Sequence, residues 1–323
     1  MSEHRTPRRS ALALALLLVA APGTAAGPAE PAGPLDPEPL RILLTNDDGV
    51  DAPGLDALRA ALRAAGHEVV VVAPRRNQSG RGRALSTDVG GFVDVIEQRP
   101  GVWAVESTPA DAVRAALGAV MADAPPDLVV SGLNFGENLA RTGSVASGTV
   151  GAALHAAFEG VPAVAASVGL DLAEARARPR FASTRDAFGP AAAFVTRLVA
   201  RLREGAGAGP LLPEGVMLNV NVPVPYASIE GVEVTRLGRR GRFAFAWRDP
   251  RGVVAQGGGG LQIALEPTLV AGPGAAPDWD PLPGSDVGAF LAGRISVTPL
   301  DGDMTAGAAL REVMAVRLGG LRP

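Results

Sequence analysis

The chain has 323 residues, of which 47% are hydrophobic and 20% are charged, and its formal net charge is −3. This balance suits a globular protein with room for one large domain, and it lacks the basic face that nucleic-acid binding requires. The sequence contains neither cysteine nor lysine. This excludes thiolate nucleophiles, disulfides, Cys-ligated zinc, a P-loop lysine and Schiff-base chemistry.

Residues 1–26 are expected to form an export signal. Three arginines precede the apolar run "ALALALLLVAA", and the small residues of "PGTAAG" follow it, which places a cleavage site after Ala26. The apolar run is too short for a membrane span, which needs about 20 residues. Arg8 and Arg9 only partly match a twin-arginine signal, so the general secretory route fits better. We therefore expect an exported, periplasmic protein whose Pro-rich segment 27–40 is a tether before a domain at 41–323.

From residue 41 onward, short apolar runs alternate with amphipathic segments of helical period. The run "HEVVVVAP" is continuous and β-branched, as is typical of a strand buried on both faces of a parallel sheet. The predicted strands are 41–45, 67–74, 91–96, 102–105, 126–132, 161–167, 215–223 and 294–300. The predicted helices are 52–66, 109–121, 147–159, 183–204, 284–292 and 304–317. This order predicts an α/β, Rossmann-like three-layer sandwich with a mostly parallel sheet.

The pattern changes between about residues 228 and 284. Short strand-like pieces alternate there with Gly- and Pro-rich stretches such as "RGVVAQGGGG". We expect a protruding antiparallel β-hairpin or arm that lies outside the main sheet.

Polar side chains follow several predicted strands at the point where each strand ends. Ligands of an open parallel sheet bind outside the carboxyl ends of its strands. The segments "TNDDG", "RRNQSG" and "SGLNFGENL" bring Asp47, Asp48, Ser79 and Asn134 to that edge. Carboxylate, hydroxyl and amide oxygens suit Mg²⁺, Mn²⁺ or Ca²⁺. A cation would also relieve the repulsion between the two adjacent carboxylates.

The segment "SVASGTVGAALHAA" predicts an anion site beside this cation site. Ser147, Gly148 and Thr149 stand where a helix begins, so free N–H groups, two hydroxyls and the positive end of the helix dipole coincide there. An oxygen-ligated cation next to an anion site is the minimal equipment for hydrolysis of a phosphate ester.

Each of these features has a simpler interpretation when it is taken alone. "NDDG" is a good turn sequence, Ser147 or Thr149 could be a plain helix cap, and Asn134 could merely tolerate a left-handed backbone. His67 and His155 are expected to be surface and packing residues, respectively. The arrival of all the polar segments at one edge of the sheet favours a site.

Six segments follow one another along the chain: "RILLTNDDGVDAPGL", "EVVVVAPRRNQSG", "STPADAVRAAL", "PDLVVSGLNFGENL", "SGTVGAALHA" and "RISVTPLDGD". In this order they resemble the successive motifs of the SurE family, the stationary-phase survival-protein 5′-nucleotidases. The resemblance implies a metal-dependent phosphatase that acts on nucleoside 5′-monophosphates and, in some members, on 3′-monophosphates or polyphosphate. It implies a Rossmann-like fold with a hairpin and an exchanged C-terminal segment, and hence a homodimer or homotetramer.

The resemblance also implies roles for particular residues. Asp47, Asp48, Ser79 and Asn134 match the ligands of one divalent ion, Mg²⁺ or Mn²⁺, with Ca²⁺ as a possible occupant in a structure. Asn46, which we count as catalytic with the two aspartates, and the Ser147–Thr149 turn match the phosphate pocket. Asp111, in "TPAD", matches a further motif and is expected to buttress the site from the first turn of its helix.

The sequence departs from the family at residues 141–146, where Ala146 stands at a position that is often aromatic. This segment is expected to be a loop that faces the nucleoside. Two rivals stay open: a glycosyltransferase that uses a sugar nucleotide, and an exported binding protein without catalysis. Phosphate release from AMP without an acceptor sugar would separate the first rival from a phosphatase. Tight nucleotide binding without turnover in excess Mn²⁺ would favour the second.

Overall fold

The computed structural model describes residues 39–248, 264–269, 282–305 and 307–319. The predicted export signal and nearly all of the predicted tether lie outside the described residues, as does much of the predicted arm. Within the described part of the chain, no helix has the length and apolar character needed to cross a bilayer.

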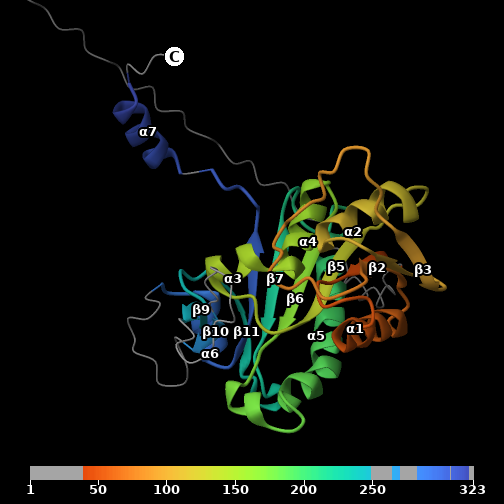
Figure 1. The fold of residues 1–323 in the computed structure, drawn as a ribbon, viewed down its shortest axis with the longest axis horizontal. Coiled ribbons are helices and arrows are strands. Elements are labelled where there is room, and N and C mark those ends of the chain that lie inside the picture. The colour runs from red at the N-terminus through yellow and green to blue at the C-terminus, as the bar shows by residue number, and fades with distance from the viewer. Residues whose placement is uncertain (1–38, 249–263, 270–281, 306, 320–323) are drawn as a thin grey trace, which may run out of the picture. The chain divides into compact units, whose positions relative to one another are not determined.

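A mixed, mostly parallel sheet forms the centre of the domain, as the sequence predicts (Figure 1). Its nine strands run in the order β3-β4-β2-β1-β5-β6-β7-β11-β8, and only the pairs β3–β4 and β7–β11 are antiparallel. The strands are β1 (Arg41–Thr45), β2 (Glu68–Pro74), β3 (Val95–Arg99), β4 (Val102–Val105), β5 (Leu128–Phe135), β6 (Ala163–Val168), β7 (Met217–Val222), β8 (Gly231–Val234) and β11 (Arg294–Leu300).

Seven α-helices are present among the described residues. They are α1 (Pro53–Ala64), α2 (Pro109–Ala115), α3 (Ala140–Ala146), α4 (Gly148–Phe158), α5 (Ala182–Ala206), α6 (Asp286–Leu291) and α7 (Ala308–Arg317). The segment predicted as one helix over 109–121 leaves the α conformation at Ala115 and continues as a π-turn over Ala116–Val120. Gly118, a weak helix former, lies in that turn.

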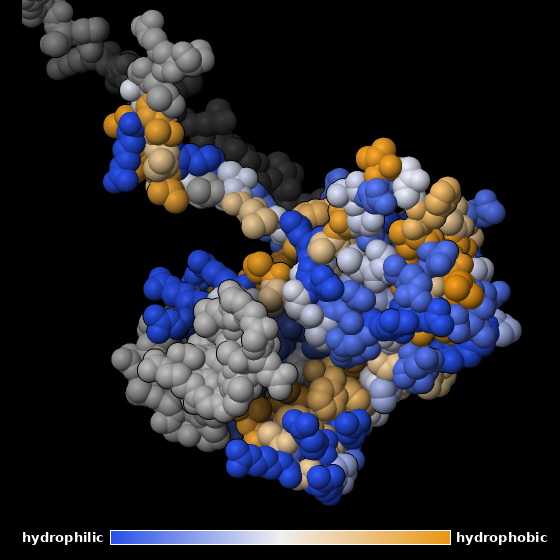
Figure 2. Space-filling model, in the orientation of Figure 1, coloured by the Kyte–Doolittle hydropathy of each residue, from blue (hydrophilic) through white to orange (hydrophobic). Residues whose placement is uncertain are grey.

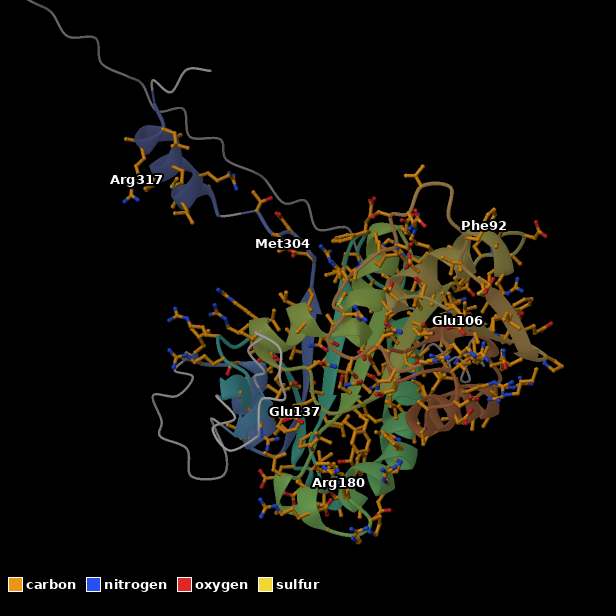
Figure 3. The ribbon with its side chains drawn as sticks, viewed as in Figure 1. Phe92, Glu106, Glu137, Arg180, Met304 and Arg317 are labelled. Carbon is orange, nitrogen blue, oxygen red and sulfur yellow. The ribbon has the colours of Figure 1, made fainter. Side chains whose placement is uncertain are left out.

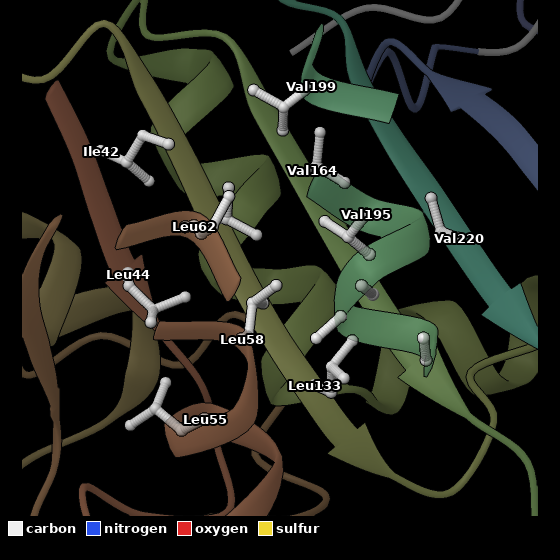
Figure 4. Close-up of a cluster of buried hydrophobic side chains, with 14 of the residues drawn as sticks. Ile42, Leu44, Leu55, Leu58, Leu62, Leu133, Val164, Val195, Val199 and Val220 are labelled. Atoms are coloured by element: carbon white, nitrogen blue, oxygen red, sulfur yellow. The ribbon is translucent and has the colours of Figure 1, made fainter. Parts of the chain in front are cut away.

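Helices cover both faces of the sheet and produce the three predicted layers. Ile42 and Leu44 of β1 belong to the core beneath α1 and α5, whereas Leu43 belongs to the core beneath α2 and α4 (Figures 1 and 4). This alternation is the two-residue period of a strand buried on both faces. From α1, the side chains of Leu55, Leu58 and Leu62 enter the first of these cores at helical spacing.

The region predicted as a separate arm is divided between two structures. β9 (Phe243–Arg248) and β10 (Ala264–Leu269) form an antiparallel pair of their own, which agrees with the predicted hairpin. The expectation that the whole region 228–284 lies outside the main sheet is wrong for β8, which pairs in parallel with β11. β11 pairs with β7 along one side, and β8 pairs with its other side and completes the sheet.

The final helix, α7, begins at Ala308, four residues later than predicted, and none of its residues is buried. Its apolar side chains include Leu310, Val313 and Met314, which are 55%, 44% and 40% exposed, respectively (Figure 2).

Candidate active site

Three neighbouring strands of the sheet bring the predicted ligands together. β2, β1 and β5 lie side by side, and the polar segments lie at their carboxyl ends. Asp47, Ser79, Asn134 and Ser147 line one hollow of about 320 Å³. Asp48 lines an adjoining hollow of about 250 Å³, and Phe135 borders both. A larger hollow, of about 580 Å³, lies between α4 and the segment after β11, but the carboxylate pair is not part of its lining. The two hollows that share the aspartates therefore form the candidate active site.

The turn after β1 is built by Asn46 and Gly49. The Asn46 side chain is fully buried, donates to the Gly49 carbonyl over 3.0 Å and accepts from the Gly49 N–H over 3.2 Å. Gly49 has a φ of +114°, a conformation that favours glycine. Asn46 is not among the residues that line the hollow. In this structure it fixes the turn that presents the two aspartates.

Asp47 is held by the start of α4. Its Oδ2 accepts the Gly148 N–H over 3.1 Å, and its Oδ1 accepts the Thr149 hydroxyl in a short hydrogen bond. A Cβ added at Gly148 would lie 2.7 Å from Asp47 Cβ, so only glycine permits this approach. The Gly148 N–H and the Thr149 hydroxyl, which the sequence predicts to bind phosphate, therefore donate to the Asp47 carboxylate in this structure, and neither residue is among those that line the hollow.

Ser147 caps the same helix, with its Oγ accepting the Val150 N–H over 3.1 Å. The cap uses the oxygen as an acceptor, so the hydroxyl proton of Ser147 is left to donate to an anion in the hollow that this residue lines. The simple reading as a cap and the reading as a phosphate contact are therefore compatible.

Asp48 accepts one hydrogen bond at each carboxylate oxygen. The Phe135 N–H donates to Oδ2 over 2.9 Å, and the Asn77 amide donates to Oδ1 over 3.2 Å. Burial raises the pKa of Asp48 to about 6, the Phe135 N–H lowers it in part, and the charge of Asp47 raises it further. Burial also raises the pKa of Asp47, against the lowering effect of its hydrogen bonds from Thr149 and Gly148. A bound cation would offset the repulsion between the two carboxylates and would lower the pKa of both.

Asn134 is oriented as a ligand would be. Its Nδ2 donates to the Gly136 carbonyl over 2.6 Å, which identifies Oδ1 as the oxygen available for a cation. Ser79 lies on an exposed loop that is fastened by the bond from the Gln78 N–H to the Asp47 carbonyl, 2.7 Å long. The donor set of two carboxylates, one amide and one hydroxyl fits Mg²⁺ or Mn²⁺ with water completing the shell. No cluster of three Asp, Glu, His or Cys side chains suited to a metal occurs in the described part of the chain.

Asp111 lies in the first turn of α2 and outside both hollows. Its Oδ2 accepts the Ser107 hydroxyl over 2.6 Å, the Ser86 N–H over 3.0 Å and the Thr108 hydroxyl over 3.0 Å. Burial raises the pKa of Asp111, but these hydrogen bonds outweigh burial and the net shift is downward. Asp111 ties the segment around Ser86 to α2, whose Pro109 would lie 3.0 Å from a Cβ at Gly148.

Residues 141–146 form the helix α3 rather than the expected loop. Thr142, Gly143 and Ala146 line the same hollow as Asp47 and Ser147. The segment therefore borders the site as expected, although in a different conformation.

Sequence reasoning missed a network of buried asparagine and serine hydrogen bonds next to α3. Asn138 lines the hollow, its N–H donates to Asn221 Oδ1 over 2.7 Å, and its amide donates to Ser167 Oγ over 2.9 Å. Asn219 donates to the Asn138 carbonyl over 2.9 Å. The signal was present in "NVNV" of β7, where asparagine recurs every second residue in a strand that is otherwise apolar and buried.

Sequence reasoning also missed a buried ion pair. Arg242, just before β9, donates to Oε1 of Glu137 over 2.8 Å, and both residues line the hollow. Glu137 is labelled in Figure 3. The side chains of Arg242 and Glu137 are 10% and 2% exposed. Because 105 residues separate them, no local pattern could have paired them.

Comparison with known proteins agrees with this architecture. The family model described as "Survival protein SurE" matches residues 42–243. A 5′-nucleotidase SurE of Xanthomonas campestris pv. campestris (strain 8004) is 41% identical over 285 residues, which is 87% of this chain and 97% of that protein. A 5′-nucleotidase SurE of Thermosynechococcus vestitus is 39% identical over 281 residues, covering 85% of this chain and 95% of its own length.

Among solved structures, the SurE protein of Aquifex aeolicus is similar with a TM-score of 0.66 and 30% sequence identity. The similarity covers 86% of this chain and 99% of that one. Both the motifs predicted from the sequence and the α/β fold are thereby confirmed. The chain belongs to the SurE family.

Proposed function

We propose that this protein is a divalent-cation-dependent 5′-nucleotidase that hydrolyses nucleoside 5′-monophosphates to nucleoside and phosphate. The observation that carries the proposal is the adjacent pair of Asp47, which is buried, and Asp48, which is half-buried; the pair shares an edge of the sheet with Ser79 and Asn134. The relatives named 5′-nucleotidase SurE, at about 40% identity over most of the chain, support the same reaction.

Asp47, Asp48, Ser79 and Asn134 would hold the cation. When bound, the cation polarises the phosphoryl group and lowers the pKa of a coordinated water. The chain's own residues provide the preorganisation. The α4 start fixes Asp47, the Phe135 N–H fixes Asp48 and the Gly136 carbonyl fixes Asn134. Ligands fixed in this way would hold the cation in place, and the held cation would stabilise developing negative charge without reorganisation, which suits phosphoryl transfer.

The phosphate would lie against the α4 start. The Ser147 hydroxyl donates to a phosphate oxygen, and the positive end of the helix dipole favours the dianion. Gly148 and Thr149 contribute in part through Asp47, to which both donate. Asn46 would act indirectly, because both polar atoms of its side chain form hydrogen bonds with the Gly49 backbone.

A substrate panel tests the proposal. Nucleoside 5′- and 3′-monophosphates, polyphosphate and an aryl phosphate are each incubated with Mg²⁺, Mn²⁺ or EDTA, and phosphate release is measured. Rapid hydrolysis of 5′-monophosphates that stops in EDTA is the expected result. The 3′-monophosphate and polyphosphate arms decide whether the wider activities of the family extend to this chain. Tight binding of AMP without phosphate release in Mn²⁺ would instead support a binding protein.

We also propose that the protein is a homodimer or homotetramer and is exported to the periplasm. The exposed apolar side chains of α7 are suited to burial against a second copy. The apolar run at 11–21 with arginines before it supports export. Light scattering of the purified protein and cell fractionation with processing at Ala26 test the two statements separately.

A further inference from the structure

The hollow beside Asp48 has an aromatic and cationic wall. It is bordered by Asp48, the start of α1 at Ala52–Gly54, Phe135, Arg185 and Phe188. The Arg185 guanidinium carbon lies 5.3 Å from the centroid of the Phe135 ring. Only 4% of the chain is aromatic, so two phenylalanines are not expected beside Asp48 by composition alone.

Two further rings fix the orientation of Phe135. Phe181 meets it edge to face with centroids 5.7 Å apart, and Phe188 is tilted against it at 6.2 Å. Phe181 has a φ of +54°, a left-handed conformation that non-glycine residues rarely adopt. Backbone strain of this kind persists where the surrounding structure enforces it, and it gathers at functional sites. The Arg180 guanidinium carbon lies 5.7 Å from the centroid of the Phe181 ring, which extends the cluster to the residues just before α5.

The cluster is only partly core packing. Phe188 is buried in the core beneath α1 and α5, whereas Phe135 is half-buried and Arg185 is exposed. A half-buried ring paired with an exposed guanidinium is a surface on which a planar, electron-rich ring can stack.

Phe135 is linked directly to the proposed cation site. It follows Asn134 in the chain, and its N–H donates to Asp48 Oδ2 over 2.9 Å. It also borders the hollow that contains Ser147. A ring stacked here would therefore belong to a molecule whose phosphate reaches the two aspartates.

We propose that the hollow bordered by Asp48, Phe135 and Arg185 holds the nucleobase of the substrate against the Phe135–Arg185 pair, with purines preferred because they offer the larger stacking surface. The inference rests on the proposed 5′-nucleotidase function and assigns its leaving-group subsite. It predicts that the enzyme distinguishes a nucleotide from a phosphate ester that has no base.

Phe135→Leu tests the subsite with two substrates, AMP and glycerol 2-phosphate. Loss of base stacking is expected to lower kcat/KM for AMP about tenfold, mainly through KM. The value for glycerol 2-phosphate should change less than about twofold, because its alcohol has no ring to stack and the variant keeps the backbone N–H of residue 135 that donates to Asp48. Inhibition by adenosine should weaken in the variant, while inhibition by inorganic phosphate should be unchanged. An equal loss for both substrates, or no loss for AMP, would overturn the inference.

Arg185→Gln provides an independent test on an exposed side chain, in case Phe135→Leu disturbs folding. Its matched control is Arg197→Gln, because Arg197 is also exposed on α5 and stacks on Phe194 at 6.0 Å, away from either hollow. Arg185→Gln should raise KM for AMP, and Arg197→Gln should not. Equal effects of the two substitutions would contradict the proposal.

The rival position for the base is the α3 wall of the larger active-site hollow. If the base binds there, Ala146→Leu would raise KM for AMP and Phe135→Leu would not. That pattern would refute the subsite at Phe135. If the unmodified protein hydrolyses no nucleotide, the proposed function fails. Calorimetric binding of AMP in Ca²⁺ to the unmodified protein and to Phe135→Leu then tests the subsite on its own, and equal affinities would overturn it.

Discussion

The glycine at the start of α4 should be indispensable for catalysis. In Gly148→Ala, the new Cβ would lie 2.7 Å from Asp47 Cβ, 2.8 Å from Asp47 Oδ2 and 3.0 Å from Pro109 Cγ. Real Cβ atoms are almost never this close to another atom, so Asp47 must move away and weaken its hydrogen bond from the Gly148 N–H. Overpacking of this kind costs about 1–3 kcal/mol of stability. A displacement approaching 1 Å at a catalytic group lowers the rate about 100-fold.

The assay compares kcat for AMP in saturating Mn²⁺ with the free energy of unfolding in urea. Gly205→Ala on α5 is the matched control, because this position is exposed and a Cβ there meets nothing within 4 Å. It should leave kcat unchanged and stabilise the protein by about 0.4–1 kcal/mol. If Gly148→Ala retained full activity, the close approach of α4 to Asp47 would not matter for catalysis, and our account of the site would be wrong.

Three further predictions concern the carboxylates. Asp47→Asn should abolish Mn²⁺-dependent hydrolysis of AMP and preserve the far-ultraviolet circular dichroism spectrum; an active variant would refute the assignment of this ligand. The folded-state pKa of Asp48, about 6, lies above the ordinary 3.8, so without a cation this group loses its stabilising effect as the pH rises through that window. Mn²⁺ should therefore raise Tm more at pH 7.5 than at pH 5, and equal shifts at the two values would contradict this linkage. The pKa of Asp111 is lowered, so its carboxylate stabilises the fold above the ordinary pKa of 3.8 and loses that effect only as the pH falls further. Asp111→Asn should lower the free energy of unfolding in urea by about 1–3 kcal/mol at pH 7 and by nearly the same amount at pH 5. A loss that is much smaller at pH 5 than at pH 7 would contradict a lowered pKa of Asp111.

The edge of the sheet at which the site lies could be predicted because it follows from one geometric rule. Parallel strands connected by helices bring their carboxyl ends to the same edge, so Asp47, Ser79 and Asn134 converge although they are far apart in the chain. Gly148 could be predicted as a position of close approach, but the atom that it approaches could not.

Features that depend on long-range partners could not be predicted. α3 contains Gly143 and Thr142, which are weak helix formers, and its first turn is held from outside. The Ala140 N–H donates to Asp286 Oδ2 over 2.8 Å, and the Arg141 N–H donates to the Gly238 carbonyl over 3.1 Å. Tertiary contacts thus stabilise a helix that local propensity does not favour.

The place of β8 in the main sheet also escaped prediction. Its pattern of alternating burial is that of a half-covered edge strand, which resembles the strands of a free hairpin. β8 pairs with β11, which lies about 60 residues further along the chain, so no local pattern could have shown that it belongs to the main sheet.

The central claim is that Asp47 and Asp48 hold a divalent cation that is required to cleave nucleoside 5′-monophosphates. The most direct measurement is the rate of phosphate release from AMP as Mn²⁺ is titrated into protein stripped with EDTA, with bound Mn²⁺ counted in the same samples. We predict no release in EDTA and a rate that saturates as one ion binds per chain. Full activity in EDTA, or saturation of the Mn²⁺ site without hydrolysis of AMP, would contradict the account.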